Sequence, residues 1–301
     1  RALKAAEQGL LSRAWALLRT AGALTRRGGG WTPAPPEAVS AMFPAAPEAD
    51  PTWFVPGRSR PPEPPPKSVH LAQRALRGLP PRSGAGPDRL PGDLLKSLAR
   101  SDALAGPAVA RGVAALSSTL ALGALHARAR ELLLAARVVP IAKSDGGTRP
   151  IAILAVAVRT AIGLQVGPAA RLAAPELRED GQFAIRTASA CERVACMVQV
   201  AHEAGQAVAL VDRRNAYGAV YRRSLRNAVE QRLADCLPLF DTIYGAPTPL
   251  CGHVVEGTRA SNGVLQGDPL APLAFALFAA EQAKRMRARL PKAKFVQYLD
   301  D

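Results

Sequence analysis

The chain has 301 residues and a formal net charge of +15, with 39 Lys and Arg against 24 Asp and Glu. That length allows a sizeable core with two or three subdomains, and the charge favours a polyanionic partner, nucleic acid before a membrane surface. No uncharged apolar run reaches the length of a membrane span, which argues against a membrane protein. The four Cys lack the C-x-x-C spacing of a zinc ribbon, and they favour a reduced intracellular setting.

The first 67 residues divide into two segments of different composition. Residues 1–32 form a basic segment, in which Leu, Ala and Trp15 alternate with Arg and Lys at roughly helical spacing. Packing on the domain behind it is favoured for this helix over binding to RNA or membrane. Residues 33–67 are a Pro-rich linker, with 12 of the 27 Pro of the chain between 33 and 66. No regular helix is expected there, so this linker should run extended or as a strap across the surface.

A hairpin is the clearest local structure of the next part, residues 68–180. Helices are predicted over 69–79, 91–99 and 103–136, with a Gly- and Pro-rich turn at 82–89. Strands at 137–143 and 148–153 then flank Asp145-Gly146, a strong hairpin signal. The hairpin sets Lys143 and Arg149 on neighbouring strands, and two cations on such a ribbon suit the grip of a triphosphate.

The last part, residues 181–301, alternates helical and strand patterns. Helices are predicted at 188–203, 221–234 and 273–284, after an earlier one at 159–172, and strands at 207–212, 251–256 and 294–299. A loop punctuated by Gly and Pro, residues 261–272, opens the last helix. This interleaved order predicts an α+β fold.

Carboxylates end two of these predicted strands. Asp212 closes the apolar run 207–212, and Asp300 and Asp301 close the run 294–299. A buried pair of neighbouring Asp usually coordinates a cation, and strand alternation would turn one of the two towards the site. Two adjacent strands that each end in Asp make the oxygen-rich site that Mg²⁺ prefers, and two such ions commonly drive nucleotidyl transfer.

Five blocks of the sequence, in their order along the chain, together resemble a reverse transcriptase. Residues 298–301 resemble the Tyr-x-Asp-Asp box, and Asp212 with Ala216 and Tyr217 resembles the D-x-x-x-A-(F/Y) box. Residues 263–270 resemble the Q-G loop, and 141–151 the fingers hairpin. Residues 83–88 resemble the extra upstream block of non-LTR retrotransposons, and the wording Q-G-D-P-L leans towards the site-specific branch of that group.

The resemblance implies a fold and an activity. The fold would be the fingers (68–180) and palm (181–301) of a reverse transcriptase behind a helix-rich N-terminal extension, in a fragment that ends at the Tyr-x-Asp-Asp box without a thumb. The activity would be RNA-templated DNA synthesis as part of a retrotransposon polyprotein, in the nucleus, using an RNA template, a DNA primer and deoxynucleoside triphosphates. Without its thumb the fragment should be weakly active or inactive, because phosphate contacts supply most of the affinity for the primer duplex.

The resemblance also implies roles for single residues. Asp212 and Asp300 would carry two Mg²⁺ ions, or Mn²⁺ in their place, with Asp301 in support. Tyr217 would lie under the sugar and exclude a 2′-hydroxyl. Lys143 and Arg149 would bind the phosphates of the incoming nucleotide. Gln266 and Gly267 would form the floor under the nascent base pair. Nucleic-acid contacts would come from Gly86, Asp88 and Tyr298.

Two features depart from the family pattern, and two other readings stay open. Arg213 follows Asp212 where an apolar residue is commoner, and the block 182–186 replaces one in which many relatives have more Gly. The same fold could serve a group II intron maturase, a retron-like enzyme or a viral RNA polymerase, although Tyr217 argues against the last. The chain could also be a decayed copy that binds RNA without catalysis, against which the presence of all three Asp argues.

Overall fold

The computed structural model describes residues 36–45, 53–57, 63–101, 104–142, 148–252, 255 and 257–299. The chain divides into two compact units, Arg1–Ala34 and Pro35–Asp301, and every described residue belongs to the second. The predicted helix within residues 1–32 lies outside the described residues. So do Lys143, Asp300 and Asp301.

Four strands form one sheet in the order β2-β1-β3-β4. The first two, β1 (Ala136–Ala142) and β2 (Thr148–Ile153), pair antiparallel from Arg137 opposite Ile153 to Ala142 opposite Thr148, so the predicted hairpin strands are confirmed. β3 (Thr248–Cys251) runs parallel to β1, and β4 (Arg259–Ala260) runs antiparallel to β3. A fold that mixes helices with this sheet agrees with the α+β expectation in its broad sense.

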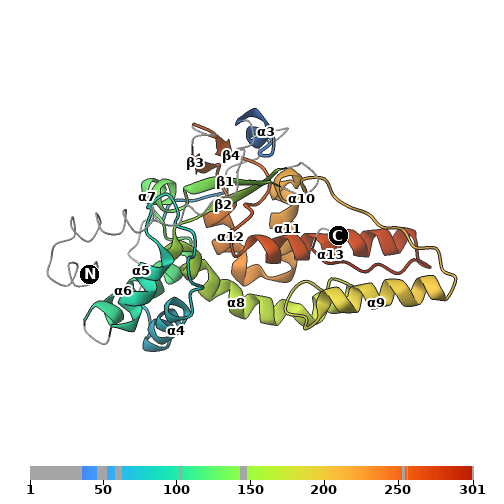
Figure 1. Ribbon diagram of the computed structural model, residues 1–301, viewed down its shortest axis with the longest axis horizontal. Coiled ribbons are helices and arrows are strands. Elements are labelled where there is room, and N and C mark those ends of the chain that lie inside the picture. Colours follow the sequence, from blue (N-terminus) through green and yellow to red (C-terminus); the bar gives the residue numbers. More distant parts are fainter. Residues whose placement is uncertain are drawn as a thin grey trace. The chain divides into compact units, whose positions relative to one another are not determined.

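The helix α8 (Val156–Glu179) is central to the core. It runs from the sheet towards α9 and packs against α4 (Pro66–Arg77), α6 (Ala105–Ala121) and α13 (Ala271–Arg289) (Figure 1). Buried residues extend along it from Val156 to Leu177, and many of them are Ala, whose small side chain lets helices approach closely. The buried Ser117 hydroxyl of α6 donates to the Ala161 carbonyl of α8 at 2.8 Å. The core therefore lies between the helices that flank α8.

The other helices complete this arrangement, and most were predicted. They are α5 (Gly92–Arg100), α7 (Ala127–Leu133), α9 (Ala190–Glu203), α10 (Ala216–Ala219), α11 (Arg222–Arg232), the short 3-10 helix η1 (Ala234–Cys236) and α12 (Leu237–Tyr244). The predicted helices are confirmed at α4, α5, α6 with α7, α8, α9, α11 and α13. In contrast, α12 was not predicted.

The Pro-rich linker holds a short helix, contrary to prediction. The helix is α3 (Pro36–Ser40), and Val39 on it is fully buried. A Pro at the first helical position loses no hydrogen bond, because the N–H of that position has no helical partner. Beyond α3, the Met42 carbonyl accepts a hydrogen bond from Asn215 Nδ2 at 3.1 Å. This part of the linker therefore packs beside α10.

Residues 53–57 form an extended segment, the aromatic strap. The N–H groups of Trp53 and Phe54 both donate to the Gly245 carbonyl, at 2.8 and 3.1 Å. The Phe54 ring centroid lies 5.1 Å from the Arg130 guanidinium carbon, and the Trp53 centroid lies 5.5 Å from that of Arg226. The strap thus covers two arginines near the C-terminal end of α12.

Two predicted strands are wrong. Residues 207–212 are exposed and outside any strand, and 294–299 holds only an isolated bridge between Gln182 and Gln297. The predicted strand 251–256 starts at the last residue of β3, and its residues 253, 254 and 256 lie outside the described residues. Leu210 and Val211 are 84% and 70% exposed. A strand requires a hydrogen-bonding neighbour, and an apolar run alone does not supply one.

None of the helices within the described ranges combines the length and apolar character needed to cross a bilayer.

Candidate functional site

The Q-G loop, residues 263–270, lies directly against strand β2. The Ala152 N–H donates to the Gln266 carbonyl at 2.7 Å. Gly267 has a φ of +116°, and an ideal Cβ there would lie 2.7 Å from the Ala152 carbonyl oxygen. Only glycine adopts this backbone conformation without strain and also leaves room for the β2 backbone. Gln266 and Gly267 are therefore joined to the hairpin that carries Arg149.

The other end of the same loop is held by the residues that follow Asp212. The Val264 N–H donates to the Tyr217 carbonyl at 2.8 Å, and the Gly263 N–H donates to the Val220 carbonyl at 2.9 Å. Gly263 has a φ of +64°, and a Cβ there would overlap the Tyr217 carbonyl oxygen. The loop thus bridges β2 and α10, which are far apart in sequence.

Tyr217 is half-buried and stacks on Phe275 of α13. The two ring centroids are 5.0 Å apart and the rings are 9° from parallel. The Arg213 guanidinium carbon lies 5.9 Å from the centroid of the same Phe275 ring. This stack holds the Tyr217 ring in place beside the Q-G loop.

A buried arginine supports the loop from behind. Arg222 is 2% exposed, and its guanidinium donates to the Gly263 carbonyl at 2.9 Å, to Ala260 at 2.8 Å, to Tyr244 at 3.1 Å and to Ala246 at 3.0 Å. A planar fork with five N–H donors can satisfy several carbonyls at once, which a Lys ammonium does less well. Sequence reasoning missed Arg222, because it is one cation among several on a basic helix.

Asp268 of the Q-G-D-P-L sequence is also buried behind the loop. Its carboxylate accepts hydrogen bonds from the Tyr244 hydroxyl and from the Leu270 N–H, the latter at 3.1 Å. Burial raises the pKa of Asp268 to about 6, although these hydrogen bonds oppose the shift. Burial and the neighbouring Asp268 raise the pKa of Tyr244 well above its usual value. Asp268 thus links the end of the loop to Tyr244 of α12 and to Leu270, the residue before α13, a role that nothing in the sequence indicated.

The upstream block that contains Gly86 and Asp88 packs on the end of the hairpin. A Cβ at Gly86 would overlap the Ala155 backbone, so this glycine permits a close approach. Arg137 of β1 donates twice to the Ala85 carbonyl, at 2.9 and 2.7 Å.

Asp88 itself is exposed and forms a hydrogen bond within its own loop. Its carboxylate accepts the Leu90 N–H at 3.2 Å. The Asp88 charge also acts on Arg159, whose pKa is lowered mainly by burial and partly restored by that charge. Arg159 donates to the Gly84 carbonyl at 2.6 Å, so two arginines tie the upstream block to the hairpin and α8.

The proposed metal ligands are not brought together among the described residues. Asp212 is exposed and forms no hydrogen bond or ion pair with a described residue. Asp300 and Asp301 lie outside the described residues, and within the described ranges no group of three or more His, Cys, Asp or Glu could hold a metal. Arg149 is exposed on β2 opposite Ile141.

Gln182 holds the segment that leads to Asp300. Its side chain is fully buried and binds both backbone groups of Leu299: the Leu299 N–H donates to Oε1 at 2.9 Å, and Nε2 donates to the Leu299 carbonyl at 3.2 Å. Beside it, the Phe183 N–H donates to the Gln297 carbonyl at 2.9 Å. Sequence reasoning noted this block only as a departure and missed the role of Gln182, since its partner lies more than a hundred positions away.

Tyr298 lies beside the start of α9. A hydrogen bond with the Cys191 side chain raises the pKa of Tyr298, and the charge of the nearby Glu192 adds a smaller effect. Tyr298 is half-buried, which leaves part of the ring available to a ligand.

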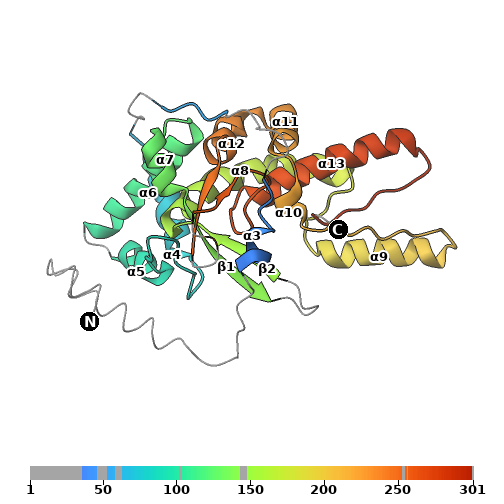
Figure 2. The same cartoon turned by 90° about the horizontal axis from the view of Figure 1, so that it is seen from above.

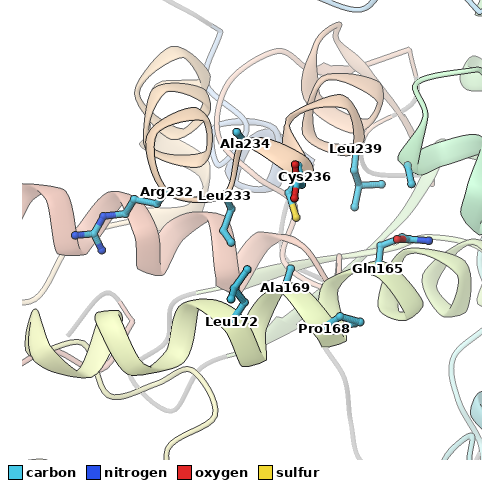
Figure 3. A pocket seen from close by; sticks show the side chains of 11 residues that line it. Gln165, Pro168, Ala169, Leu172, Arg232, Leu233, Ala234, Cys236 and Leu239 are labelled. Atoms are coloured by element: carbon cyan, nitrogen blue, oxygen red, sulfur yellow. The ribbon is translucent and has the colours of Figure 1, made fainter.

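A pocket of about 390 Å³ lies elsewhere, between α8 and the turn that joins α11 to α12 (Figure 3). Leu172 and Gln165 of α8 face Leu233, Cys236 and Leu239 across it. Burial raises the pKa of the Cys236 thiol. None of the predicted site residues lines this pocket, so it is separate from the Q-G loop.

No family model matches the chain. An alignment of 104 residues is 34% identical to the Retrotransposable element SLACS 132 kDa protein of Trypanosoma brucei gambiense. It covers 31% of this chain and 8% of that protein. Part of this chain is similar to a retrotransposon protein.

Proposed function

We propose that the chain is the fingers and palm of an RNA-directed DNA polymerase from a non-LTR retrotransposon, of the site-specific branch. One observation carries the proposal: the Q-G loop joins the basic hairpin on one side to the box after Asp212 on the other. Blocks that the sequence places far apart are thus neighbours in space. The similarity to a retrotransposable element protein supports the same class of element.

In this proposal the described residues position the nucleotide. Arg149, exposed on β2, contributes a cation beside the loop. The backbone of Gln266 and Gly267 forms a floor that Arg222 and Asp268 keep rigid. The stacked ring of Tyr217 excludes a 2′-hydroxyl and so selects deoxynucleotides. A floor with little freedom loses little entropy when the nucleotide binds.

The carboxylates fit a divalent cation by their chemistry. Asp212 is exposed and free of ion pairs with described residues, so its oxygens are available to the hard cation that carboxylates prefer. Asp212, Asp300 and Asp301 would hold Mg²⁺, or Mn²⁺ in its place. Such ions, when bound, would lower the pKa of the primer 3′-hydroxyl and neutralise charge on the leaving pyrophosphate.

Catalysis in this proposal requires residues 207–212 to pair with 294–299, so that Asp212 and Asp300 meet. Two observations support this pairing. The apolar side chains of Val208, Leu210 and Val211 are 41%, 84% and 70% exposed, as expected for a strand without its neighbour. Gln182 already holds Leu299, next to Asp300, in a fixed position.

The test is primer extension on an RNA template with Mg²⁺, using the natural protein in which this sequence occurs. We expect deoxynucleotide incorporation, its loss in Asp212→Ala and its retention in Asp235→Ala, a matched change at an exposed Asp of η1. Tyr217→Ala should admit ribonucleotides. Absence of incorporation with RNA binding intact would contradict the proposal and favour a non-catalytic, RNA-binding copy. A disulfide between Cys residues introduced at Val208 and Val296, which lie opposite each other when Asp212 meets Asp300, would test the strand pairing separately.

A further inference from the structure

The C-terminal end of α13 and the residues after it form a basic tip, residues 284–294. Six of its 11 residues are cations, and no Asp or Glu occurs between Glu281 and Asp300. The cations are Lys284, Arg285, Arg287, Arg289, Lys292 and Lys294. The tip therefore concentrates positive charge on one short surface segment.

One of the six cations faces inward and is neutralised. Arg287 lies 3.6 Å from the Asp180 carboxylate, donates to the Asp180 carbonyl and lies 5.9 Å from the Phe295 ring centroid. The other five are exposed, and none forms a hydrogen bond or ion pair with a described residue. Arg287 is therefore part of the packed structure, whereas the other five cations face solvent.

Two carboxylates close to the tip, Asp180 and Glu281, do not cancel this charge, because arginines bind both of them. Arg232 of α11 binds Asp180 and, at 2.7 Å, Glu281 of α13. Asp180 is shared with Arg287. In both views the end of α13 projects beyond α11 and α12 (Figures 1 and 2). A ligand could therefore approach the five outward cations without displacing a packed element.

We propose that the basic tip binds single-stranded RNA at a surface separate from the nucleotide site. Exposed, unpaired cations bind phosphates and release counterions. Arg285 and Arg289 are one helical turn apart, so they lie on one face and can contact neighbouring phosphates. Met286 and Leu290, 41% and 54% exposed, form an adjacent apolar stripe.

The apolar stripe is the reason for proposing single-stranded RNA, and not a duplex, as the ligand. Unstacked bases can pack on apolar side chains, whereas a duplex presents its phosphates outward and keeps its bases stacked. A surface of cations alone would have no such preference. The stripe beside the cations therefore favours single-stranded RNA over duplex.

The test compares two triple variants with the same change of charge. Arg285→Gln/Arg289→Gln/Lys292→Gln removes three outward cations from the tip, and Arg100→Gln/Arg111→Gln/Arg128→Gln removes three exposed cations from α5, α6 and α7. Binding of a short single-stranded RNA is followed by fluorescence anisotropy over a range of salt. We expect the tip variant to bind about tenfold more weakly and its log Kd to depend less on log salt by about 2, and the control to change less than about twofold.

Binding to duplex RNA, binding to vesicles of anionic lipid and thermal unfolding are measured for the same variants. Equal losses in both triple variants would overturn it, since the effect would then reflect total charge. An equal loss of duplex binding, or a loss confined to vesicles of anionic lipid, would also overturn it. Unchanged thermal unfolding of the tip variant is expected, because none of its three side chains has a partner in the described structure. Binding is measured without nucleotide and in the Asp212→Ala background, so the result is independent of polymerase activity.

Discussion

The Q-G loop and the two segments that lead to the carboxylates differ in how they are held. In the loop, Leu265 and Asp268 are 1% and 2% exposed, and hydrogen bonds join it to β2, α10 and Arg222. In residues 206–212, Leu210 and Val211 are 84% and 70% exposed. The surface proposed to receive a nucleotide is therefore packed within the described structure, whereas Asp212 lies on an exposed segment that has no strand partner among the described residues.

The largest expected effect is at Gly263. Its φ of +64° and the overlap of any Cβ with two carbonyl groups mean that Gly263→Ala must distort the loop. We expect the free energy of unfolding to fall by about 5 kcal/mol, measured by urea denaturation. The control is Gly112→Ala in α6, where a Cβ meets no atom within 4 Å, and a gain of up to about 1 kcal/mol is expected. Similar values for the two variants would show that the loop is not tightly held.

Arg222→Met should lower the free energy of unfolding by about 4 kcal/mol, because buried carbonyls would lose their donors. Arg222→Lys should fall between wild type and Arg222→Met, since a single ammonium reaches fewer of these carbonyls. Arg128→Met, an exposed cation on α7, should change stability by less than about 0.5 kcal/mol. Chemical denaturation of all three variants tests this order. If Arg222→Met left the free energy of unfolding unchanged, Arg222 would not support the loop.

The raised pKa of Asp268 predicts how the free energy of unfolding depends on pH. Its pKa in the fold is about 6 against an ordinary 3.8, so the folded state holds the proton more tightly than the unfolded chain. This contribution is fully present below about pH 4 and is lost as pH rises through 6, an amount of about 3 kcal/mol. Urea unfolding of the wild type and Asp268→Asn at several pH values isolates it. The idea fails if both proteins show the same slope between pH 4 and 6.

A smaller effect is expected at Gln182, on the border between the two regions. Gln182→Met keeps the volume but removes both hydrogen bonds to Leu299, so the free energy of unfolding should fall by about 2 kcal/mol. Hydrogen exchange at the Leu299 amide should quicken more than at the loop amides. Gln199→Met is the control, because this exposed side chain bonds only to Glu203 one turn away. Unchanged exchange at Leu299 would mean that Gln182 does not hold the segment.

The smallest effect is expected in residues 206–212. Leu210→Ser with Val211→Ser should change the stability of this chain by less than about 0.5 kcal/mol, because both side chains are exposed. The same pair in the natural protein in which this sequence occurs should lower nucleotide incorporation if the segment becomes a palm strand there. Calorimetry of the double variant of this chain measures the change in stability, and primer extension measures the change in nucleotide incorporation. A large stability loss in this chain would show that the segment is already packed.

Local signals were enough for the hairpin and for most helices. Asp145-Gly146 between two apolar runs predicted the antiparallel strands β1 and β2, whose connection lies outside the described residues, and Gly263 and Gly267 belong to a loop that the sequence identified. The sequence could not show which strand edges find a partner, so 207–212 was assigned as a strand on its apolar character alone. It also could not distinguish a buried charge from a surface one. Arg222 lies 41 residues from Gly263, and Gln182 lies 117 residues from Leu299, so their roles depend on contacts that only folding creates.

The aromatic strap has a practical consequence for shortening the chain. A protein that starts at residue 63 would retain all five sequence blocks, and sequence comparison alone would recommend it. It would lack Phe54 and Trp53, whose rings cover Arg130 and Arg226. Arg130 donates to the carbonyls of Thr242, Ile243 and Ala246, and Arg222 also donates to Ala246. Water admitted at the strap would therefore reach the same turn that anchors the Q-G loop, so a shortened version of this chain should begin upstream of Trp53.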